Sequence, residues 1–346
     1  MVSSSFNADA SIIELKGSYF EMGKTLGELY RQNKFNFSFL PKFNTKQIEM
    51  ADEAEKLVEK YLPGMLDFLK GMSEAGYNYN DLRLLPLALA HSTESSPSCT
   101  VIYLPAGYTR SGSGIFIRNY DWEYSSIPLY TKTHFQLDNG IENYSFSDLW
   151  FGAYGGVNKE GLCMAITAAP TYCGRKSVGI IMTLALQWSL DHFKSCQEAI
   201  GFMERIPHLG AFNYLISDKQ GNAVRIAATS EKVHFEHGSQ KLMVQTNHYV
   251  NQEMEYLHDP QKLFPSTLSR YNNAHKWAWK NKGGIGPAES EKFMKLPLEE
   301  GGIFDYAVWE GKENGTIWGW YFDYETMTLH YSVSKPDGIP FKAMRL

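Results

Sequence analysis

The stretch Ser98-Cys99-Thr100-Val101-Ile102-Tyr103 decides the fold, together with the run Ile115-Phe116-Ile117-Arg118-Asn119-Tyr120-Asp121-Trp122 that follows a short loop. Both runs are rich in β-branched and aromatic residues, and the loop at 105–114 holds the Pro and Gly residues typical of a hairpin connection. In such a hairpin, Arg118 and Asp121 return to the level of Cys99. A nearby cation favours a thiolate and a carboxylate orients a base, so the hairpin carries the components of an activated thiol. The same residues also fit a buried cysteine beside a structural ion pair.

The composition is that of a globular protein with a large core. The chain has 346 residues, of which 43% are hydrophobic and 21% are charged, enough for one large domain or two smaller ones. Its formal net charge of −5 argues against general nucleic-acid binding. Its four cysteines are too few for a disulfide framework and fit a reducing compartment. Because the first ten residues lack the features of a signal peptide and no run of about eighteen apolar residues occurs, we expect a soluble cytoplasmic protein without membrane contact.

Hydrophobic periodicity divides the chain into a helical first part and a strand-rich second part. A short strand is predicted at Ser11–Leu15, followed by helices whose apolar faces are clearest in Tyr19–Asn33 and in residues 45–75. The polar segment 91–98 is the best boundary in the chain. Beyond the hairpin, predicted strands up to residue 167 are followed by two helices and then by more strands. This order predicts a layered α+β sandwich in which helices cover stacked antiparallel sheets.

Three motifs in this second part resemble one enzyme family. Cys99-Thr100 is followed about twenty residues later by Arg118-Asn119-Tyr120-Asp121-Trp122, and Thr246-Asn247-His248 ends a predicted strand. The third motif, Ser266-Thr267-Leu268-Ser269-Arg270-Tyr271, leads into a helix predicted at Tyr271–Lys280. Their order resembles that of the N-terminal nucleophile hydrolases of the penicillin acyltransferase and choloylglycine hydrolase group, over most of residues 99–280. An ordered set of five positions is much harder to obtain by chance than any single motif.

The resemblance implies a four-layer αββα sandwich formed by residues 99–346, preceded by a mainly helical segment, residues 1–98. It implies that the chain cleaves itself between Ser98 and Cys99, and that the first fragment stays bound as the second subunit of a heterodimer. Cys99 then carries a free α-amino group, whose reference pKa of about 7.7–8.0 suits proton transfer near neutral pH. We therefore expect an amidohydrolase or acyltransferase that acts on a small acyl amide and uses no cofactor and no metal ion.

The same resemblance implies roles for four further residues. Asp121 holds the α-ammonium or the thiol, Arg118 stabilises the thiolate or binds substrate, Asn247 donates to the oxyanion, and Arg270 supports the site. Without the resemblance, an asparagine at a strand end fits an Asx turn and an arginine on a helix fits a solvated surface. The chain departs from the bile-salt branch at Thr167-Ala168-Ala169, where that branch carries another asparagine. A backbone N–H there is the remaining donor for the oxyanion.

Five aromatic residues close to these motifs in sequence are candidates for an apolar acyl pocket: Tyr103, Trp122, Tyr124, Trp150 and Phe151. Other interpretations stay open. One is a papain-like site that uses Cys99 and His248, and another is a metal site at His234 and His237, which alternation in a strand places on opposite faces. A third is a binding protein that keeps the fold, never cleaves itself and holds an acylated small molecule. The sequence does not choose between hydrolysis and acyl transfer.

Overall fold

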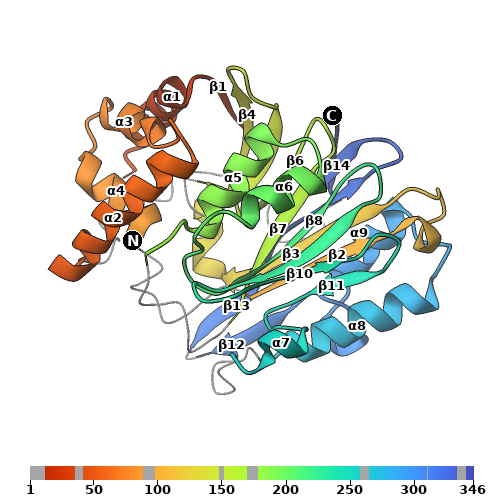
Figure 1. The fold of residues 1–346 in the computed structure, drawn as a ribbon. Helices are drawn as coiled ribbons and strands as arrows, with labels where there is room; N and C mark the ends of the chain where they lie inside the picture. The colour runs from red at the N-terminus through yellow and green to blue at the C-terminus, as the bar shows by residue number, and fades with distance from the viewer. Residues whose placement is uncertain are drawn as a thin grey trace.

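Two stacked β-sheets form the centre of the protein, and helices lie on both outer faces (Figure 1). The structure is a computed structural model that describes residues 12–35, 42–88, 98–147, 152–169, 178–257, 265–309, 311–332 and 340–346. The layered α+β sandwich predicted from the sequence is confirmed.

The first sheet contains eight of the described strands, in the spatial order β1 (Ile13–Gly17), β4 (Thr131–Leu137), β5 (Asn143–Ser147), β6 (Gly155–Asn158), β7 (Cys163–Ala168), β8 (Phe212–Ser217), β9 (Ala223–Ala228) and β10 (Val233–His237). The path of the second sheet is β11 (Met243–Gln245), β2 (Ser98–Leu104), β3 (Ile115–Glu123), β13 (Lys312–Asp323), β14 (Thr328–Tyr331) and β15 (Lys342–Arg345), and β12 (Tyr306–Trp309) pairs with the first half of β13. Neighbouring described strands run antiparallel except β1 and β4, which are parallel.

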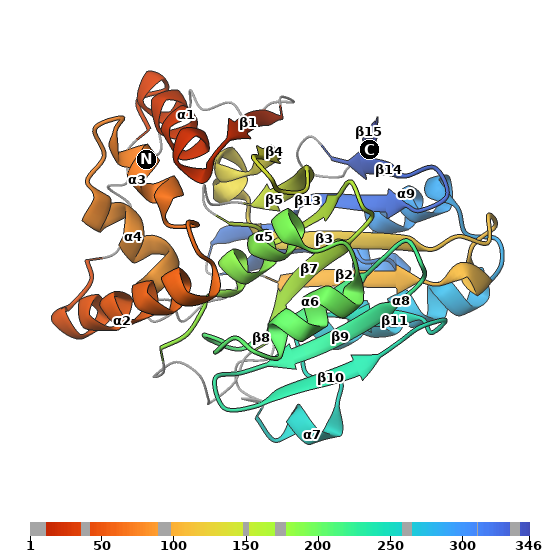
Figure 2. The same ribbon diagram turned by 45° about the horizontal axis from the view of Figure 1, so that its top comes forward.

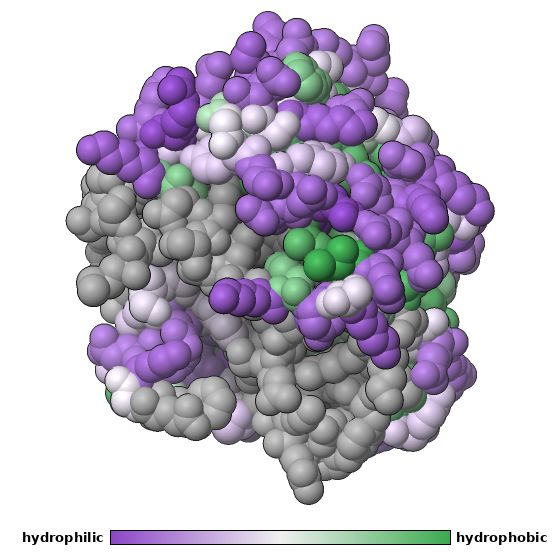
Figure 3. All heavy atoms as spheres, turned by 90° about the vertical axis from the view of Figure 1, so that its left-hand side faces the viewer, coloured by the Kyte–Doolittle hydropathy of each residue, from purple (hydrophilic) through white to green (hydrophobic). Residues whose placement is uncertain are grey.

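Helices α5 (Met182–His192) and α6 (Cys196–Met203) cover the first sheet, and α8 (Thr267–Lys280) and α9 (Pro287–Lys295) cover the second (Figures 1 and 2). The short helix α7 (Gln252–Glu255) follows β11. At one end of the sandwich lie α1 (Tyr19–Gln32), α2 (Thr45–Tyr61), α3 (Asp67–Ser73) and α4 (Tyr79–Ala88). Figure 3 shows this end of the molecule, where the surface is mainly hydrophilic around a small apolar patch. No helix in the described ranges is long and apolar enough to span a membrane.

The β2–β3 hairpin forms in the predicted register. Ser98 pairs with Asp121 and Cys99 pairs with Tyr120, while Arg118 pairs with Val101. Because side chains alternate along a strand, each strand of the hairpin faces two different layers. One face packs between the sheets with the main core, and the other face packs under α8 and α9 in a second apolar cluster. At the start of β2, the side chain of Cys99 therefore faces the layer between the two sheets, while neighbouring side chains on the hairpin face the helices.

The first 88 residues contribute to the sandwich directly, because β1 is an edge strand of the first sheet. Tyr19, at the start of α1, donates its hydroxyl proton to Asp191 of α5 at 2.6 Å. Helices α1 and α3 cross closely at two glycines, since a Cβ atom on Gly23 would lie 1.8 Å from the Phe68 carbonyl oxygen and one on Gly71 would lie 2.0 Å from the Phe20 carbonyl oxygen. The strand predicted at Ser11–Leu15 occupies Ile13–Gly17 instead.

Two differences from the predicted elements concern the second half. The helix predicted at Tyr271–Lys280 begins at Thr267, and its buried face is Thr267, Arg270, Ala274 and Ala278. The spacing of these four residues is helical, but two of them are polar, so apolar periodicity does not mark the first turn. Helix α9 and strand β15 were not predicted. Polar and charged residues make up much of both segments, and each packs only one or two apolar side chains.

Candidate active site

The Cys99 thiol lies between the two sheets beside the Arg118 guanidinium. Cys99 is 2% exposed, and Arg118 Nη2 donates to its Sγ at 3.4 Å. Arg118 is fully buried, its Nη1 donates to the carbonyl oxygen of Ile166, and its guanidinium lies 5.2 Å from the centre of the Trp318 ring. A buried guanidinium is costly unless such partners compensate its charge. The planar guanidinium can stack on an aromatic ring, which a lysine side chain cannot do. The structure therefore places a fixed positive charge at the sulfur atom.

The thiol is nevertheless held in its neutral form by burial. Burial raises the pKa of the Cys99 thiol to about 11, although the positive charge of Arg118 acts to lower it. Asp121 raises it further through its negative charge, and Arg270 opposes that effect. Because burial outweighs the two arginines, little thiolate is present near neutral pH.

The backbone of Cys99 is held by a second set of groups on the other face of the hairpin. Its amide N–H donates to Asn247 Oδ1 at 2.7 Å. Its carbonyl oxygen accepts a bond from Arg270 Nη1, and Arg270 Nη2 donates to both Ser98 Oγ and Asn247 Oδ1, the latter at 3.1 Å. Arg270 Nη1 also donates to Thr100 Oγ1 at 3.0 Å. The guanidinium, fully buried in the first turn of α8, thus joins the start of β2 to the end of β11.

The orientation of the Asn247 carboxamide follows from its partners. Two N–H donors, from Cys99 and Arg270, meet the oxygen, while Nδ2 donates to the carbonyl oxygen of Ala168 at 3.0 Å. A flipped amide would place Nδ2 against both donors, so the orientation is determined by the network. The Asn247 backbone N–H donates to Thr267 Oγ1 at 2.8 Å, which ties the turn to the start of α8. The oxygen of Asn247, and not its nitrogen, therefore faces the backbone nitrogen of Cys99.

Asp121 lies on the same face as Arg270, opposite to the thiol. Its Oδ1 accepts a bond from Thr316 Oγ1 at 2.7 Å, and its Oδ2 lies 3.8 Å from Arg270 Nη1. Arg270 Nε is also 3.6 Å from Asp305 Oδ2. Burial raises the pKa of Asp121 to about 6, with Arg270 acting to lower it and the negative charge of Asp305 acting to raise it. One arginine is thus shared by two carboxylates beside Cys99.

The structure brings all five candidate catalytic residues together, and their arrangement differs in one respect from the prediction. Arg118 and Asp121 were expected to flank the thiol from the hairpin. Strand alternation instead places Arg118 at the sulfur and Asp121 on the opposite face, paired with Ser98. The thiol thus lies on the opposite face of the strand from Asp121.

The candidate pocket residues lie in three different places. Trp122 and Tyr124 follow Asp121 directly, and the Tyr124 ring lies 5.9 Å from that of Tyr306, at the same end of the sandwich as the site. Tyr103 lies at the far end of β2 in the main core, and its hydroxyl reaches the turn at Gly114. This distance from Cys99 argues against a role for Tyr103 in substrate binding, because four residues of strand span about 13 Å. Trp150 and Phe151 lie outside the described residues.

The Thr167-Ala168-Ala169 segment contacts this network through one carbonyl oxygen and one hydroxyl group. The oxygen of Ala168 accepts the bond from Asn247 Nδ2, and the N–H of Ala169 donates to the carbonyl oxygen of Ala211 at 3.0 Å. Thr167 Oγ1 donates to the carbonyl oxygen of Thr246 at 2.7 Å. The segment thus locks the turn that carries Asn247, and the N–H of Ala169 is used within the fold.

Three residues that contact the network were not singled out in the sequence: Thr267, Asp305 and Thr316. They come from α8, from the residue before β12 and from β13. Thr267 lies within the 266–271 motif but was given no role there, and no local motif marks Asp305 or Thr316. The helical spacing of Thr267 and Arg270 is the one signal that pointed to a polar buried face.

The alternative constellations do not assemble around the thiol in the described structure. His248 Nδ1 lies 3.1 Å from Thr246 Oγ1 and 3.0 Å from Thr267 Oγ1, so this ring nitrogen faces the start of α8. His234 Nε2 lies 2.7 Å from Asn251 Nδ2. Within the described ranges, no group of three His, Cys, Asp or Glu side chains is placed to hold a metal ion.

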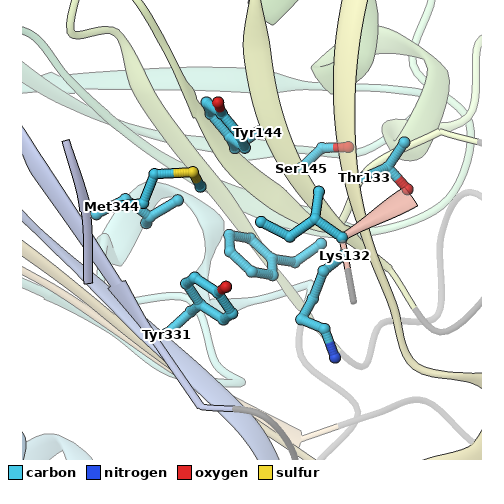
Figure 4. Close-up of a pocket in the computed structure, with 9 residues that line it drawn as sticks. Lys132, Thr133, Tyr144, Ser145, Tyr331 and Met344 are labelled. Atoms are coloured by element: carbon cyan, nitrogen blue, oxygen red, sulfur yellow. The ribbon is translucent and has the colours of Figure 1, made fainter. Parts of the chain in front are cut away.

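A narrow crevice lies elsewhere, at the edge of the sandwich between β4 and β5 of one sheet and β14 and β15 of the other. Tyr144, Tyr331 and Met344 surround it, with Lys132 at one side (Figure 4). None of the five candidate catalytic residues lines it. It is therefore separate from the Cys99 site.

Comparison with known families identifies the family of the chain. The model of the acyl-coenzyme A:6-aminopenicillanic acid acyl-transferase family matches residues 108–337, about two thirds of the chain. The chain belongs to this family, and thereby to the N-terminal nucleophile enzymes that the motifs resemble. The matched range includes Arg118, Asp121, Asn247 and Arg270 and begins after Cys99. No curated protein sequence matches the chain significantly.

Several solved structures are similar in part. A variant of the conjugated bile acid hydrolase from Clostridium perfringens has a TM-score of 0.47 and 15% identity, over 72% of this chain and 92% of that one. Penicillin V acylase from Agrobacterium tumefaciens has a TM-score of 0.44 and 16% identity, over 68% and 82%. The Caenorhabditis elegans ortholog of N-acylethanolamine-hydrolyzing acid amidase has a TM-score of 0.45 and 13% identity, over 65% and 93%.

Proposed function

We propose that the chain is a self-cleaving cysteine enzyme that breaks the C–N bond of a linear acyl amide and passes the acyl group to water or to an amine. One observation carries this proposal. The two reactive groups of Cys99 meet separate partners, since Arg118 contacts the sulfur and Asn247 Oδ1 accepts the bond from the backbone nitrogen. A structural cysteine needs neither a buried cation at its sulfur nor a carboxamide at its nitrogen.

The first step is cleavage of the chain. The Cys99 sulfur attacks the carbonyl carbon of Ser98, the C–N bond to Cys99 breaks, and the nitrogen takes up a proton. Water then opens the resulting thioester, which leaves a carboxylate on Ser98 and a free thiol and amine on Cys99. Arg270 supports this geometry, because its donors meet Ser98 Oγ and the Cys99 carbonyl oxygen on the two sides of the bond that breaks.

Cleavage also changes the charge balance at the sulfur. Two arginines, Arg118 and Arg270, and two carboxylates, Asp121 and Asp305, surround Cys99, so the site is neutral when the thiol is neutral. Cleavage adds an α-ammonium group on Cys99 and a carboxylate on Ser98, so the net charge is unchanged. Because the ammonium is on the same residue as the sulfur, its positive charge favours the thiolate in the cut chain.

In turnover, the sulfur attacks the carbonyl carbon of the substrate amide. Asn247 Nδ2, which donates to the carbonyl oxygen of Ala168 in the uncut chain, is the proposed donor to the oxyanion. The α-ammonium of Cys99 protonates the departing amine and becomes a neutral base. That base then removes a proton from the water or amine that attacks the thioester, which releases the acid or the new amide.

The first fragment is proposed to stay bound after cleavage. Strand β1 is hydrogen-bonded to β4, and Tyr19 donates to the buried carboxylate of Asp191. His134 of β4 lies between Glu14 of β1 and Glu142, with its Nε2 2.7 Å from the Glu142 carboxylate. Separation would expose the edge of the first sheet and leave Asp191 with one donor fewer, so the mature form is a heterodimer.

Intact mass under denaturing conditions tests the proposal. Wild-type protein is expected to give fragments 1–98 and 99–346, and the second fragment should release acid or transfer acyl groups from a panel of N-acylated amines of varied acyl length. Cys99→Ala should give one uncut, inactive chain. Cys163→Ala is the matched control, since it removes the same sulfur atom from a fully buried position in β7 and should leave cleavage intact. An uncut and inactive wild-type chain would favour the non-catalytic binding protein.

A further inference from the structure

Thr316 makes two hydrogen bonds that fix the direction of its hydroxyl group. Its Oγ1 accepts the backbone N–H of Asp305 at 3.0 Å and donates to Asp121 Oδ1 at 2.7 Å. A hydroxyl has a single proton, and the backbone N–H can only donate, so the proton of Thr316 points to the carboxylate. Thr316 is fully buried, which excludes water as a competing acceptor. The Thr316 hydroxyl is therefore a fixed hydrogen-bond donor to Asp121 Oδ1.

A break in strand register produces this contact. Thr316 pairs with Asp121, whereas Trp318 pairs with Tyr120 and Trp320 with Arg118, so Ile317 is an extra residue in β13. Such a bulge moves the side chains on its two sides to opposite faces of the sheet. Without it, Thr316 would face the space between the sheets, as Trp318 does. The bulge turns it toward Asp121 instead.

Gly315, next to Thr316, allows the backbone of Asp305 to approach β13 closely. A Cβ atom on Gly315 would lie 2.3 Å from the Asp305 carbonyl oxygen and 2.8 Å from the Tyr124 hydroxyl. Any side chain at Gly315 would thus displace the segment that enters β12. Because the N–H of Asp305 orients Thr316, the close packing at Gly315 is part of the same arrangement.

The result is a carboxylate with one occupied oxygen and one oxygen that lacks a hydrogen-bond donor. Oδ1 accepts the bond from Thr316, while the buried Oδ2 has no hydrogen-bond partner among the residues that the structure describes and lies 3.8 Å from Arg270 Nη1. Asp121 is paired with Ser98, the residue that cleavage separates from the Cys99 nitrogen. The unoccupied oxygen is thus on the side of the strand where a new ammonium group would appear.

We propose that Thr316 is a positioning residue for the α-amino group of Cys99: by holding Oδ1 of Asp121, it keeps the carboxylate ionised and directs Oδ2 to the ammonium that cleavage releases. The inference rests on the proposed function, because it requires cleavage at Ser98. Thr316 touches neither substrate nor the sulfur and acts through Asp121. Arg270 from α8 and Asp305 before β12 are the charged groups on the face of Asp121, while Arg118 and the Cys99 thiol act on it from the opposite face of the hairpin.

The test uses cleaved protein and compares Thr316→Val with Thr316→Ser. Valine keeps the shape but cannot donate, so Asp121 binds its proton more tightly, and the acid limb of the pH profile of kcat/KM should move up by about one pH unit. The pKa of the α-amino group, read from the pH dependence of its acetylation in mass spectrometry, should fall. Serine keeps the donor and should restore both values.

Thr131→Val is the matched control, since Thr131 in β4 of the first sheet also donates from a buried strand position, to the carbonyl oxygen of Ser147 in the neighbouring β5 at 3.2 Å. It should leave both pH values unchanged. A Thr316→Val enzyme with the wild-type acid limb and amine pKa, or a shift that serine does not reverse, overturns the proposal. Loss of folded protein in both Thr316 variants would assign the residue a structural role and overturn it too. An uncut wild-type chain would instead contradict the proposed function, so the two failures are distinguishable.

Discussion

The side-chain oxygen of Asn247 accepts the amide N–H of Cys99 at 2.7 Å, across 148 residues of sequence. This bond lies where the start of β2 meets the residues that follow β11. It orients the carboxamide so that its nitrogen donates to the Ala168 carbonyl oxygen. Asn247 thus has two distinct functions in the proposed reaction, as the acceptor for the nitrogen of Cys99 and as a donor to the oxyanion. The two functions can be separated by substitution.

Asn247→Asp keeps the acceptor and removes the donor. A carboxylate still meets the Cys99 N–H and Arg270, so the site should assemble, whereas loss of the oxyanion donor should lower kcat by roughly 100-fold to 1000-fold. Circular dichroism and single-turnover kinetics check the two parts. Asn251→Asp is the control, because Asn251 uses its oxygen to accept the Glu253 N–H at 2.7 Å in the same segment. An Asn247→Asp enzyme with full kcat would remove Asn247 from the oxyanion site.

Cleavage should change the reactivity of the Cys99 thiol. Burial raises its pKa to about 11 in the uncut chain, so the thiol is protonated below that pH and alkylation by iodoacetamide should keep rising up to it. The α-ammonium of the cut chain adds a positive charge, which should move the profile to lower pH. A partly cleaved sample shows both forms in one experiment, since peptide mass spectrometry separates Cys99 at a new N-terminus from Cys99 within the uncut chain. Identical profiles would argue against coupling of the amine and the thiol.

The bond between Tyr19 and Asp191 should help to hold the two fragments together. Tyr19→Phe leaves Asp191 with the donors Asn143 Nδ2 and Gln187 Nε2, and loss of the third should destabilise the docked fragment by about 1–3 kcal/mol. Size-exclusion chromatography of the cleaved protein in increasing urea measures this. Tyr77→Phe is the control, because its hydroxyl donates to the Phe35 carbonyl oxygen within the first fragment. Equal release of the fragment by both variants would show that Tyr19 has no special role in docking.

Gly23→Ala should disrupt the crossing of α1 and α3. The added methyl group would lie 1.8 Å from the Phe68 carbonyl oxygen, which forces the helices apart and should reduce the free energy of unfolding by about 1–3 kcal/mol or more. Thermal unfolding followed by circular dichroism reads this change. A Cβ atom on Gly107 would meet nothing within 4 Å, so Gly107→Ala serves as the control. A Gly23→Ala protein as stable as wild type would mean that the crossing adjusts without strain.

Local sequence patterns determined the hairpin and the composition of the site. β-branched and aromatic residues on both sides of a Pro- and Gly-containing loop specify β2 and β3, and once the hairpin forms, its register places Cys99 opposite Tyr120. The order of Arg118, Asp121, Asn247 and Arg270 then identified the family. The same pattern did not reveal that Arg118 and Asp121 serve opposite faces of the strand, although alternation alone implies it.

Tertiary structure alone decided which atoms of these residues meet. The bulge at Ile317 turns Thr316 toward Asp121, and the first turn of α8 places Arg270 between two carboxylates and the Cys99 backbone. Neither contact leaves a mark in local sequence, because register shifts and helix docking depend on packing between segments that lie far apart in the chain. The physical reason is that a strand or helix pattern specifies which face is buried, while the partner on that face is chosen by the whole fold.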